Sequence, residues 1–221
     1  MKKAVLGLTV LVTGSIGSVF AQTPPKQAID ISAAEIQQII DHPPSRSVDQ
    51  QIKVVDIGKY NLAVGVIHRP APPANAGAGR QGAGRQGAAP ANVEHCGPAT
   101  APPGAKISAP GLISHDSELE TYQIISGEGT LITGGTIFNG VRSAADSEVT
   151  KVLNGPSCSG SAYGDFVSRV VHVGDVIIIP PGVAHGWTDI KDHVTYLSVR
   201  PDPDHVLPAG YVNPAIKDMK P

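Results

Sequence analysis

Cysteine is scarce in this sequence of 221 residues, which contains only Cys96 and Cys158. Neither cysteine belongs to a CxxC pair, so the sequence disfavours a thiolate zinc site and a thioredoxin-type redox motif. In an exported protein a lone pair of cysteines usually joins, because the compartment is oxidising. We therefore expect a disulfide between Cys96 and Cys158, with two buried free thiols as the alternative.

Positive charge is not in excess either, since 17 lysines and arginines stand against 19 acidic residues, for a formal net charge of −2. A chain without a basic footprint is not expected to bind nucleic acid. The sequence also lacks a GxSxG nucleophile motif, a P-loop and a dinucleotide-binding glycine motif. These absences leave no motif that indicates a serine hydrolase, a P-loop enzyme or a dinucleotide-dependent enzyme.

Long apolar runs are confined to the N-terminus. Lys2-Lys3 precedes an apolar run over residues 4–20, and Val19-Phe20-Ala21 suits cleavage after its last residue. This pattern is typical of a secretory signal peptide, and the glycines, serines and threonines within the run weaken the alternative of a permanent membrane anchor. We expect removal of residues 1–21, a periplasmic or secreted mature chain, and no remaining membrane span.

Residues 22–48 are predicted to form an arm with one short helix. Ser32 and Glu35 have the spacing of a capping box, in which each side chain bonds the backbone amide of the other. Three isoleucines that follow share one helical face, and His42-Pro43-Pro44 ends the helix because proline disfavours helical geometry in the preceding residue. Almost no helix is predicted after residue 41, which excludes folds of alternating strands and helices.

The rest of the chain is rich in strand signals separated by turns, which favours a barrel or sandwich. We predict a barrel over residues 49–205 and a surface tail over 206–221. Asn139-Gly140 is a type I′ hairpin signal, residues 147–152 are expected to form a strand, and residues 154–164 a loop rich in glycine and serine. The other predicted strands cover residues 51–57, 61–68, 112–115, 118–126, 130–133, 167–173, 176–179 and 194–199.

An insertion rich in alanine, glycine and proline interrupts the predicted barrel at residues 69–105. The pentapeptide GAGRQ occurs twice in tandem within it, over residues 77–86. Such a segment has too few large apolar side chains to offset its ordering entropy. We expect a flexible surface insertion between two strands.

Two stretches carry residues with the spacing of a metal site. The first reads HDSELETYQIISGEG from His115, and the second reads GDVIIIPPGVAHGWTD from Gly174. The pair resembles the two motifs of the cupin superfamily, and particularly its small secreted bacterial members. The first motif is matched at His115, Glu120 and Gly127, and the second at Gly174, Pro180, Gly182 and His185. The sequence departs from the family at three positions, where Ile113 replaces a histidine, Ile107 a glycine and Asp189 an asparagine.

The resemblance implies an all-β fold, a single double-stranded β-helix barrel of cupin type, here with a short N-terminal helical arm. It also implies that His115, Glu120 and His185 bind one divalent transition metal. Two histidines and one carboxylate suit iron(II) or manganese, with zinc, nickel or copper as alternatives. His95, Asp116 or Glu118 could supply a fourth ligand in place of residue 113, and a barrel that has lost its metal is the other alternative.

Alternation along a strand places Glu120, Tyr122 and Ile124 on one face, so all three are expected to face the barrel interior. Leu131 and Ile178 are expected to be further core residues. The pocket is expected to include Ile113, Tyr122 and Trp187, and the candidate catalytic hydroxyls are those of Tyr122 and Tyr196.

The sequence leads to two hypotheses for a function of the barrel cavity, and to a third in which the protein is a scaffold whose arm and insertion mediate assembly. The first is an exported metal-dependent oxygenase, isomerase or lyase acting on a small molecule such as a phenolic, a sugar or a carboxylic acid. The second is a non-catalytic binding or sensor protein, with or without a metal. A homodimer is compatible with both.

Overall fold

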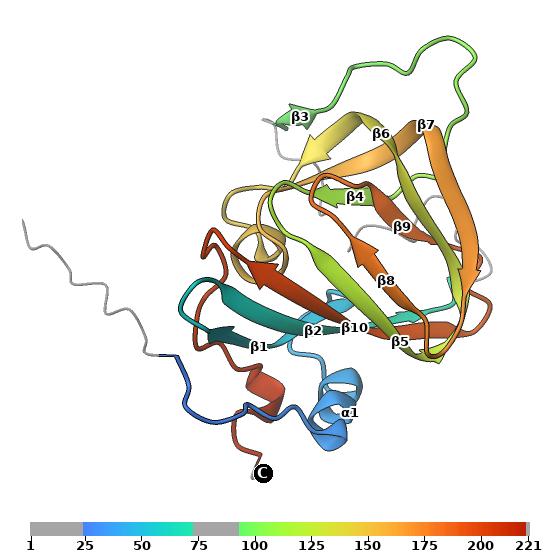
Figure 1. Ribbon diagram of the computed structural model, residues 1–221. Coiled ribbons are helices and arrows are strands. Elements are labelled where there is room, and N and C mark those ends of the chain that lie inside the picture. The colour runs from blue at the N-terminus through green and yellow to red at the C-terminus, as the bar shows by residue number, and fades with distance from the viewer. Residues whose placement is uncertain (1–23, 73–92, 220–221) are drawn as a thin grey trace, which may run out of the picture.

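The computed structural model describes residues 24–72 and 93–219. The predicted signal peptide and both GAGRQ copies lie outside these residues. The described chain forms two five-stranded antiparallel sheets that face each other as a barrel (Figure 1). Helices are few and short, and none within the described ranges is long and apolar enough to cross a membrane.

The first sheet has the strand order β1-β2-β10-β5-β8, and the second has the order β3-β6-β7-β4-β9 with β6 also paired to β9. Strands far apart in the sequence are therefore neighbours, as in a double-stranded β-helix, and the predicted all-β barrel of cupin type is confirmed. The strands are β1 (Asp49–Asp56), β2 (Asn61–Pro70), β3 (His95–Cys96), β4 (Leu112–His115), β5 (Glu120–Gly127), β6 (Gly129–Arg142), β7 (Ser157–Val171), β8 (Val176–Ile179), β9 (His185–Thr188) and β10 (His193–Asp202).

The barrel interior is filled from both sheets by alternate residues of each strand. Glu120, Tyr122 and Ile124 on β5 are all buried, as the alternation predicts. Tyr122 and Ile124 belong to the main apolar cluster inside the barrel. Its buried members are Ile67, Tyr122, Ile124, Leu131, Val171, Ile177, Ile179, Trp187, Ile190, Val194 and Tyr196.

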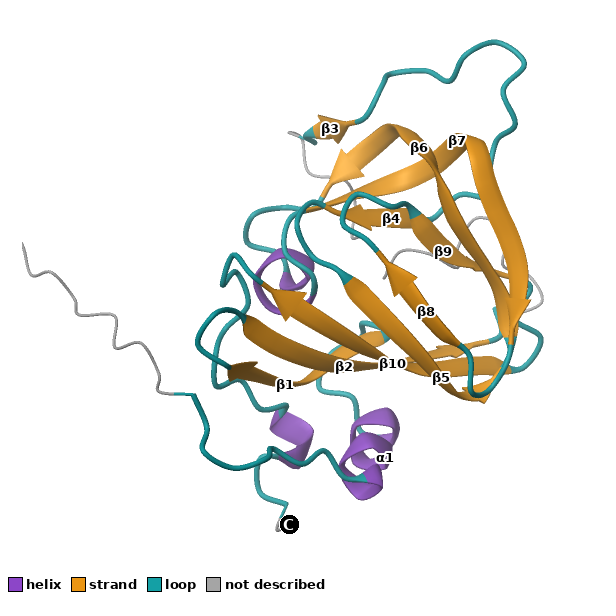
Figure 2. Cartoon of the chain, in the orientation of Figure 1, coloured by secondary structure: helices purple, strands orange, loops and turns teal. Residues whose placement is uncertain are grey.

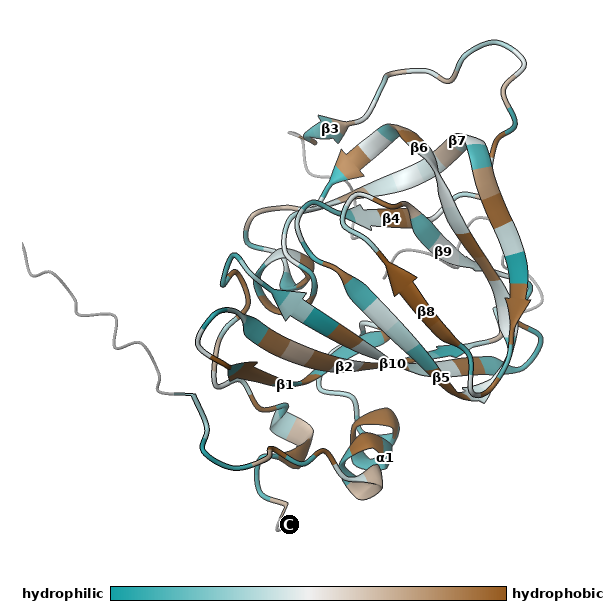
Figure 3. Ribbon diagram, viewed as in Figure 1, coloured by the Kyte–Doolittle hydropathy of each residue, from teal (hydrophilic) through white to brown (hydrophobic). Residues whose placement is uncertain are grey.

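The prediction that Ile178 is a core residue is wrong. Ile178 is 66% exposed, whereas Ile177 and Ile179 on either side are buried. All four residues of β8 are apolar (Figure 3), so the sequence contains no alternation that could reveal which face is inside. The register with β5 decides it, since Ile179 pairs with Glu120 and Ile177 with Tyr122.

The predicted N-terminal helix is confirmed as α1 (Ala33–Asp41), and both halves of its capping box are formed. The Glu35 amide donates to Ser32 Oγ at 3.2 Å, and the Ser32 amide donates to Glu35 Oε2 at 2.7 Å. Ile39 packs against the outer face of the first sheet, beside β1 and β2 (Figure 2). The helix of the arm thus covers the barrel from outside, whereas the end of the arm, at Ser47 and Val48, lines the cavity inside it.

The expected surface tail is wrong, because the C-terminal residues pack against the barrel. Leu207, Asn213 and Ile216 are buried, and a short 3-10 helix, η2 (Pro214–Ile216), contacts α1. Asn213 explains the docking, since its amide donates to the Ile52 carbonyl and its side chain donates to the Gln51 carbonyl. Proline, aspartate and glycine marked turns here, and turns can be buried when their polar groups are paired.

Three local predictions in the β6–β7 region are also wrong. Asn139-Gly140 forms a bulge within β6 instead of a hairpin, and residues 154–164 mostly belong to β7 instead of a loop. The strand expected at 147–152 is replaced by a π-helix, η1 (Val149–Leu153). Pairing between two long strands overrides the turn and loop signals at 139–140 and 154–164, because each backbone group that joins the ladder gains a partner.

The predicted disulfide between Cys96 and Cys158 is confirmed, with an S–S distance of 2.05 Å. It joins β3 to β7, so both cysteines lie in strands instead of the loops in which they were expected. A side chain at Gly140 would lie 2.8 Å from Cys158 Sγ and 3.0 Å from Cys96 Sγ, so glycine at the bulge makes room for the bond. The expected insertion also starts later than residue 69, because β2 continues through Pro70.

Candidate metal centre

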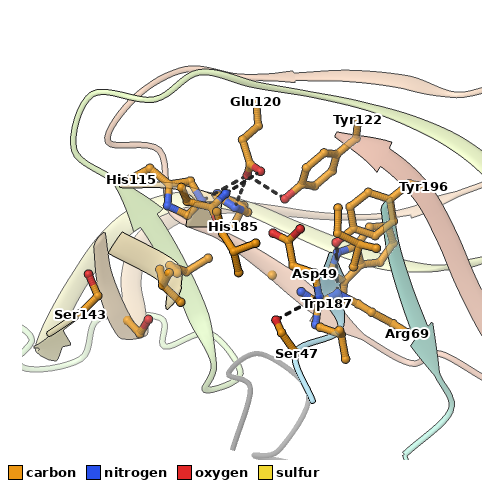
Figure 4. Close-up of a pocket in the computed structure, with 18 residues that line it drawn as sticks. Ser47, Asp49, Arg69, His115, Glu120, Tyr122, Ser143, His185, Trp187 and Tyr196 are labelled. Carbon is orange, nitrogen blue, oxygen red and sulfur yellow. Dashed lines mark hydrogen bonds and ion pairs between the residues drawn. The ribbon is translucent and has the colours of Figure 1, made fainter. Parts of the chain in front are cut away.

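Three buried side chains from three strands meet inside the barrel (Figure 4). His115 ends β4, Glu120 begins β5 and His185 begins β9. The Nε2 atoms of the two histidines lie 3.2 Å and 3.0 Å from Glu120 Oε2, respectively. One ligand atom from each residue lies within 4.8 Å of the other two, so a single ion could contact all three.

Hydrogen bonds fix which nitrogen of each histidine faces the centre. His115 Nδ1 lies 2.8 Å from Ser157 Oγ, and this hydroxyl donates its own proton to the Gly155 carbonyl. His115 must therefore donate from Nδ1, as must His185, whose Nδ1 lies 3.0 Å from the Val183 carbonyl. In their neutral forms both rings consequently direct the lone pair of Nε2 toward the centre.

These three atoms fit a metal ion. Two imidazole lone pairs and a carboxylate oxygen that converge without a cation or proton between them repel one another. His185 Nε2 is buried and, although 3.0 Å from Glu120 Oε2, forms no well-directed hydrogen bond with any described residue. A divalent cation would satisfy all three atoms, and the backbone and hydroxyl partners of Nδ1 are the supports that metal-bound histidines typically have.

Glu120 offers only one of its oxygens to this centre. Oε1 accepts hydrogen bonds from Asn154 Nδ2 at 3.1 Å, Ser198 Oγ at 2.9 Å and Arg200 Nε at 2.9 Å. Oε2 faces the histidines and accepts from the Tyr122 hydroxyl at 2.8 Å. The carboxylate is therefore oriented by hydrogen bonds before any ion binds.

The same surroundings set the protonation states of Glu120 and His115. Burial alone would raise the pKa of Glu120, but its interactions with His115 and Arg200 hold that pKa well below its usual range. Burial lowers the pKa of His115, and the Glu120 carboxylate only partly opposes this. An ionised carboxylate and a neutral imidazole are the forms that bind a metal.

Arg200 is the largest fully buried side chain among the described residues, and sequence analysis did not identify it. Besides Glu120, it pairs with Asp49 and donates to Gln51 Oε1 and the Leu153 carbonyl, both at 3.2 Å. Glycine at Gly65 provides the space, because a Cβ there would lie 3.1 Å from the guanidinium. The local sequence gave no signal, because Ser198 and Asp202 on the same face of β10 are polar as well.

The proposed replacements for the missing ligand do not join the group. Among the described residues, only His115, Glu120 and His185 come together as candidate ligands. His95 is exposed on β3, and Asp116 pairs with Arg142 at 2.6 Å. Glu118 is buried but does not line the cavity, and burial raises its pKa to about 9.

Ile113 is paired with His185 across β4 and β9, and it lines the cavity. The strand geometry thus puts this residue beside the candidate metal centre, although its side chain offers no ligand atom. The first cupin motif therefore contributes two ligands here instead of three.

A cavity of about 130 Å³ opens from the histidines and extends along the barrel. Tyr122, Trp187 and Tyr196 line it, and the Tyr122 and Tyr196 rings are 4.3 Å apart between centroids. Sequence analysis also missed Arg69 and Asp49. Arg69 lies at the far end from the histidines, and the Asp49 carboxylate lies between the histidines and Arg69 (Figure 4). The three aromatic side chains form a wall between the two polar ends.

Comparisons with known proteins identify no family for this chain and add nothing on function. No protein-family model matches the sequence, and no curated protein matches it. Similar solved structures include BH2720 from Bacillus halodurans, with 13% identity and a TM-score of 0.37 over 87% of this chain and 93% of that one. A conserved protein with a double-stranded β-helix domain from Klebsiella pneumoniae has 14% identity and a TM-score of 0.37 over 80% and 93% of the chains.

A cupin 2 conserved barrel domain protein from Rhodopseudomonas palustris has 11% identity and a TM-score of 0.32, over 81% of this chain and 69% of that one. Similarities this low carry no information on activity. The strand order of the chain itself therefore defines the fold, and its own residues must define the site.

Proposed function

We propose that this protein is an exported, metal-dependent enzyme of cupin type that acts on a small organic molecule as an oxygenase, isomerase or lyase. The observation that supports this most directly is the convergence of His115 Nε2, His185 Nε2 and Glu120 Oε2 on one buried point. A cavity for a small ligand opens from that point. A site for a metal and a site for a substrate are thus adjacent.

Two imidazole nitrogens and one carboxylate oxygen suit iron(II) or manganese, with zinc, nickel and copper as alternatives. When bound, such an ion supplies Lewis acidity and open coordination positions for substrate or water. Only three protein ligands are available among the described residues, because Ile113 contributes none. More positions are therefore open than in a site with four protein ligands.

The other residues of the site have roles that follow from their contacts. Arg200 keeps Glu120 ionised and fixes its orientation. The Tyr122 hydroxyl donates to the metal-facing oxygen of Glu120, so it can adjust the basicity of that oxygen. Burial raises the pKa of both Tyr122 and Tyr196, so these hydroxyls act as neutral donors.

Two features support export to the periplasm or beyond. The disulfide between Cys96 and Cys158 is a bond that persists in oxidising compartments. Residues 1–21 have the composition of a cleavable signal peptide.

Elemental analysis of protein purified from the periplasm tests the proposal, followed by a screen of small phenolics, sugars and carboxylic acids with and without oxygen. We expect close to one equivalent of a transition metal and metal-dependent turnover of one compound class. If native protein carries less than about a tenth of an equivalent and binds none of the five candidate metals on titration, the enzyme function is wrong.

A second candidate function, a metal-free binding protein, is favoured by one observation. Glu120 already accepts four hydrogen bonds, and Arg200 balances its charge, so the carboxylate is stabilised without an ion. A barrel of this kind could bind a small molecule in the same cavity. Ligand binding by protein that takes up no metal would support this function over the enzymatic one.

A further inference from the structure

One part of β7 is exposed on both of its faces. Residues 167–170 are all exposed, although successive side chains of a strand point to opposite faces. Val167 is 60% exposed, whereas Phe166 and Val171, which flank residues 167–170, are buried. A barrel strand ordinarily buries every second side chain, so this stretch lies at the margin of the barrel (Figure 1).

The same stretch also has one open edge. β6 pairs with β7 along one edge as far as Val171. On the other edge, β4 pairs only with residues 157–160, and the chain around Ile107 covers the edge as far as Gly164. In the part of the chain that the structure describes, no residue pairs with this edge over residues 165–171. Its outward backbone N–H and C=O groups can therefore pair with another strand.

Apolar side chains continue from this edge into β8. The chain turns after β7 into β8, which is the last strand of the other sheet and thus also has an open edge among the described residues. Val173, Val176 and Ile178 are all exposed (Figure 3). Half of the exposed large apolar side chains of the described ranges lie within residues 167–178. Such a concentration is typical of an interaction surface.

The charges of the β7 edge indicate which partner fits it. Asp165 and Arg169 are exposed, and neither forms an ion pair or a side-chain hydrogen bond with a described residue. If two copies of this edge pair in antiparallel orientation about Val167, Asp165 of each copy lies opposite Arg169 of the other. Val167 then lies opposite its own copy, at a distance that permits contact. Centring the pair on either neighbouring residue would instead place one of the two charges opposite Val167.

From these features we infer that two copies of this chain pair through the open edge of β7, in antiparallel orientation and centred on Val167. The second sheet of the barrel then continues from one copy into the other. Such a two-fold interface is closed, so it produces a dimer and no larger assembly. The inference goes beyond the proposed function and uses no residue of the candidate metal centre. A strand of a different protein is the alternative occupant of the edge.

Sedimentation velocity of the full mature chain over a range of micromolar concentrations tests the inference. We expect native protein to form a dimer and no larger species. Val167→Lys places two like charges opposite each other at the centre of the interface, so it should raise the dissociation constant about tenfold or more. Val212→Lys is the matched control, because Val212 is 42% exposed and is bridged to β1 at the far edge of the other sheet. This control should dimerise as native protein does.

Exchange of the two charges tests the register of the pairing. Asp165→Arg and Arg169→Asp each place like charges opposite each other twice, so each should weaken the dimer about 10- to 30-fold. The double variant restores opposite charges in exchanged positions, so its dissociation constant should return to within about threefold of the native value. Both side chains are exposed and unpaired among the described residues, so the fold should be retained, as circular dichroism would verify.

Three results would overturn the inference. Native protein that stays monomeric at the highest concentration would leave the edge to a different partner. A dimer that Val167→Lys leaves unchanged would use another surface. A double charge variant that dimerises no more tightly than either single variant would contradict the pairing about Val167. If Val167→Lys fails to fold, the charge variants still decide between these results.

Discussion

Arg200 Nε lies 2.9 Å from Glu120 Oε1, the carboxylate oxygen that does not contact the histidines. The two residues are separated by 80 positions in the sequence and are both almost fully buried. One oxygen of Glu120 is thus held by a fixed positive charge, and the other is left for the candidate metal. Arg200, which balances the charge of Glu120 in the barrel interior, is therefore part of the candidate metal site.

Removal of the buried guanidinium should strongly destabilise the fold. Arg200→Met leaves both Asp49 and Glu120 as uncompensated buried carboxylates, so we expect a loss of about 3–5 kcal/mol in the free energy of unfolding, measured by urea denaturation. Arg142→Met is the control, because its partner Asp116 is half exposed and the pair is worth less than about 1 kcal/mol. Equal losses in the two variants would show that the buried ion pairs of Arg200 stabilise the fold no more than the exposed pair of Arg142 does.

Variants of the candidate ligands should separate metal binding from folding. His185→Ala should remove most of the bound metal, whereas circular dichroism should remain that of a β-rich protein, because the core is formed by other residues such as Ile124 and Leu131. Ile113→His should tighten metal binding, since residue 113 pairs with His185 and lines the cavity. Metal titration followed by elemental analysis measures both. Unchanged metal content in His185→Ala would refute the ligand assignment.

The buried carboxyl of Glu118 should make stability fall with rising pH. Burial raises its pKa from 4.5 to about 9, so between these values the folded chain holds a proton that the unfolded chain has lost. Stability therefore decreases as pH rises through this window. Glu118→Gln resembles the protonated form and should remove this decrease, which thermal unfolding at several pH values would detect. Glu128→Gln, at an exposed position, should leave the pH dependence as it is. Parallel curves for native protein and Glu118→Gln would contradict the expectation.

Loss of the disulfide should matter only under oxidising conditions. The bond between Cys96 and Cys158 spans 62 residues, for which the chain-entropy model gives about 4 kcal/mol. Cys158→Ser should therefore melt at a lower temperature than native protein in buffer without reductant, and at a similar temperature in reductant. A difference that persists unchanged in reductant would assign the effect to the serine side chain instead of the lost bond.

Export should yield a mature chain that begins at Gln22, because Val19-Phe20-Ala21 has the small residue required at the cleavage point. Intact-mass spectrometry of protein from the periplasm measures this directly. A soluble product that retains residues 1–21 would contradict the prediction.

The sequence by itself determined the helix, the pairing of the cysteines and the three side chains that meet in the barrel. The helix rests on local spacing, the cysteine pairing on cysteine number, and the three side chains on the resemblance to two cupin motifs, of which the second supplies His185. Ser32 and Glu35 are three residues apart, and His115 and Glu120 lie within one motif, so short spacings fix their relative positions. With only two cysteines, a single pairing exists.

Only the tertiary structure decided the far end of the cavity and the charge that supports Glu120. Asp49, Arg69 and Arg200 lie on β1, β2 and β10, and nothing in their local sequence indicates that they meet. Strand register brings them together, and a shift of one residue would turn each side chain to the opposite face. Ile178 illustrates the same limit, because a strand of four apolar residues has no pattern from which to read its inner face. Its orientation follows from pairing with β5, a contact between residues more than fifty positions apart.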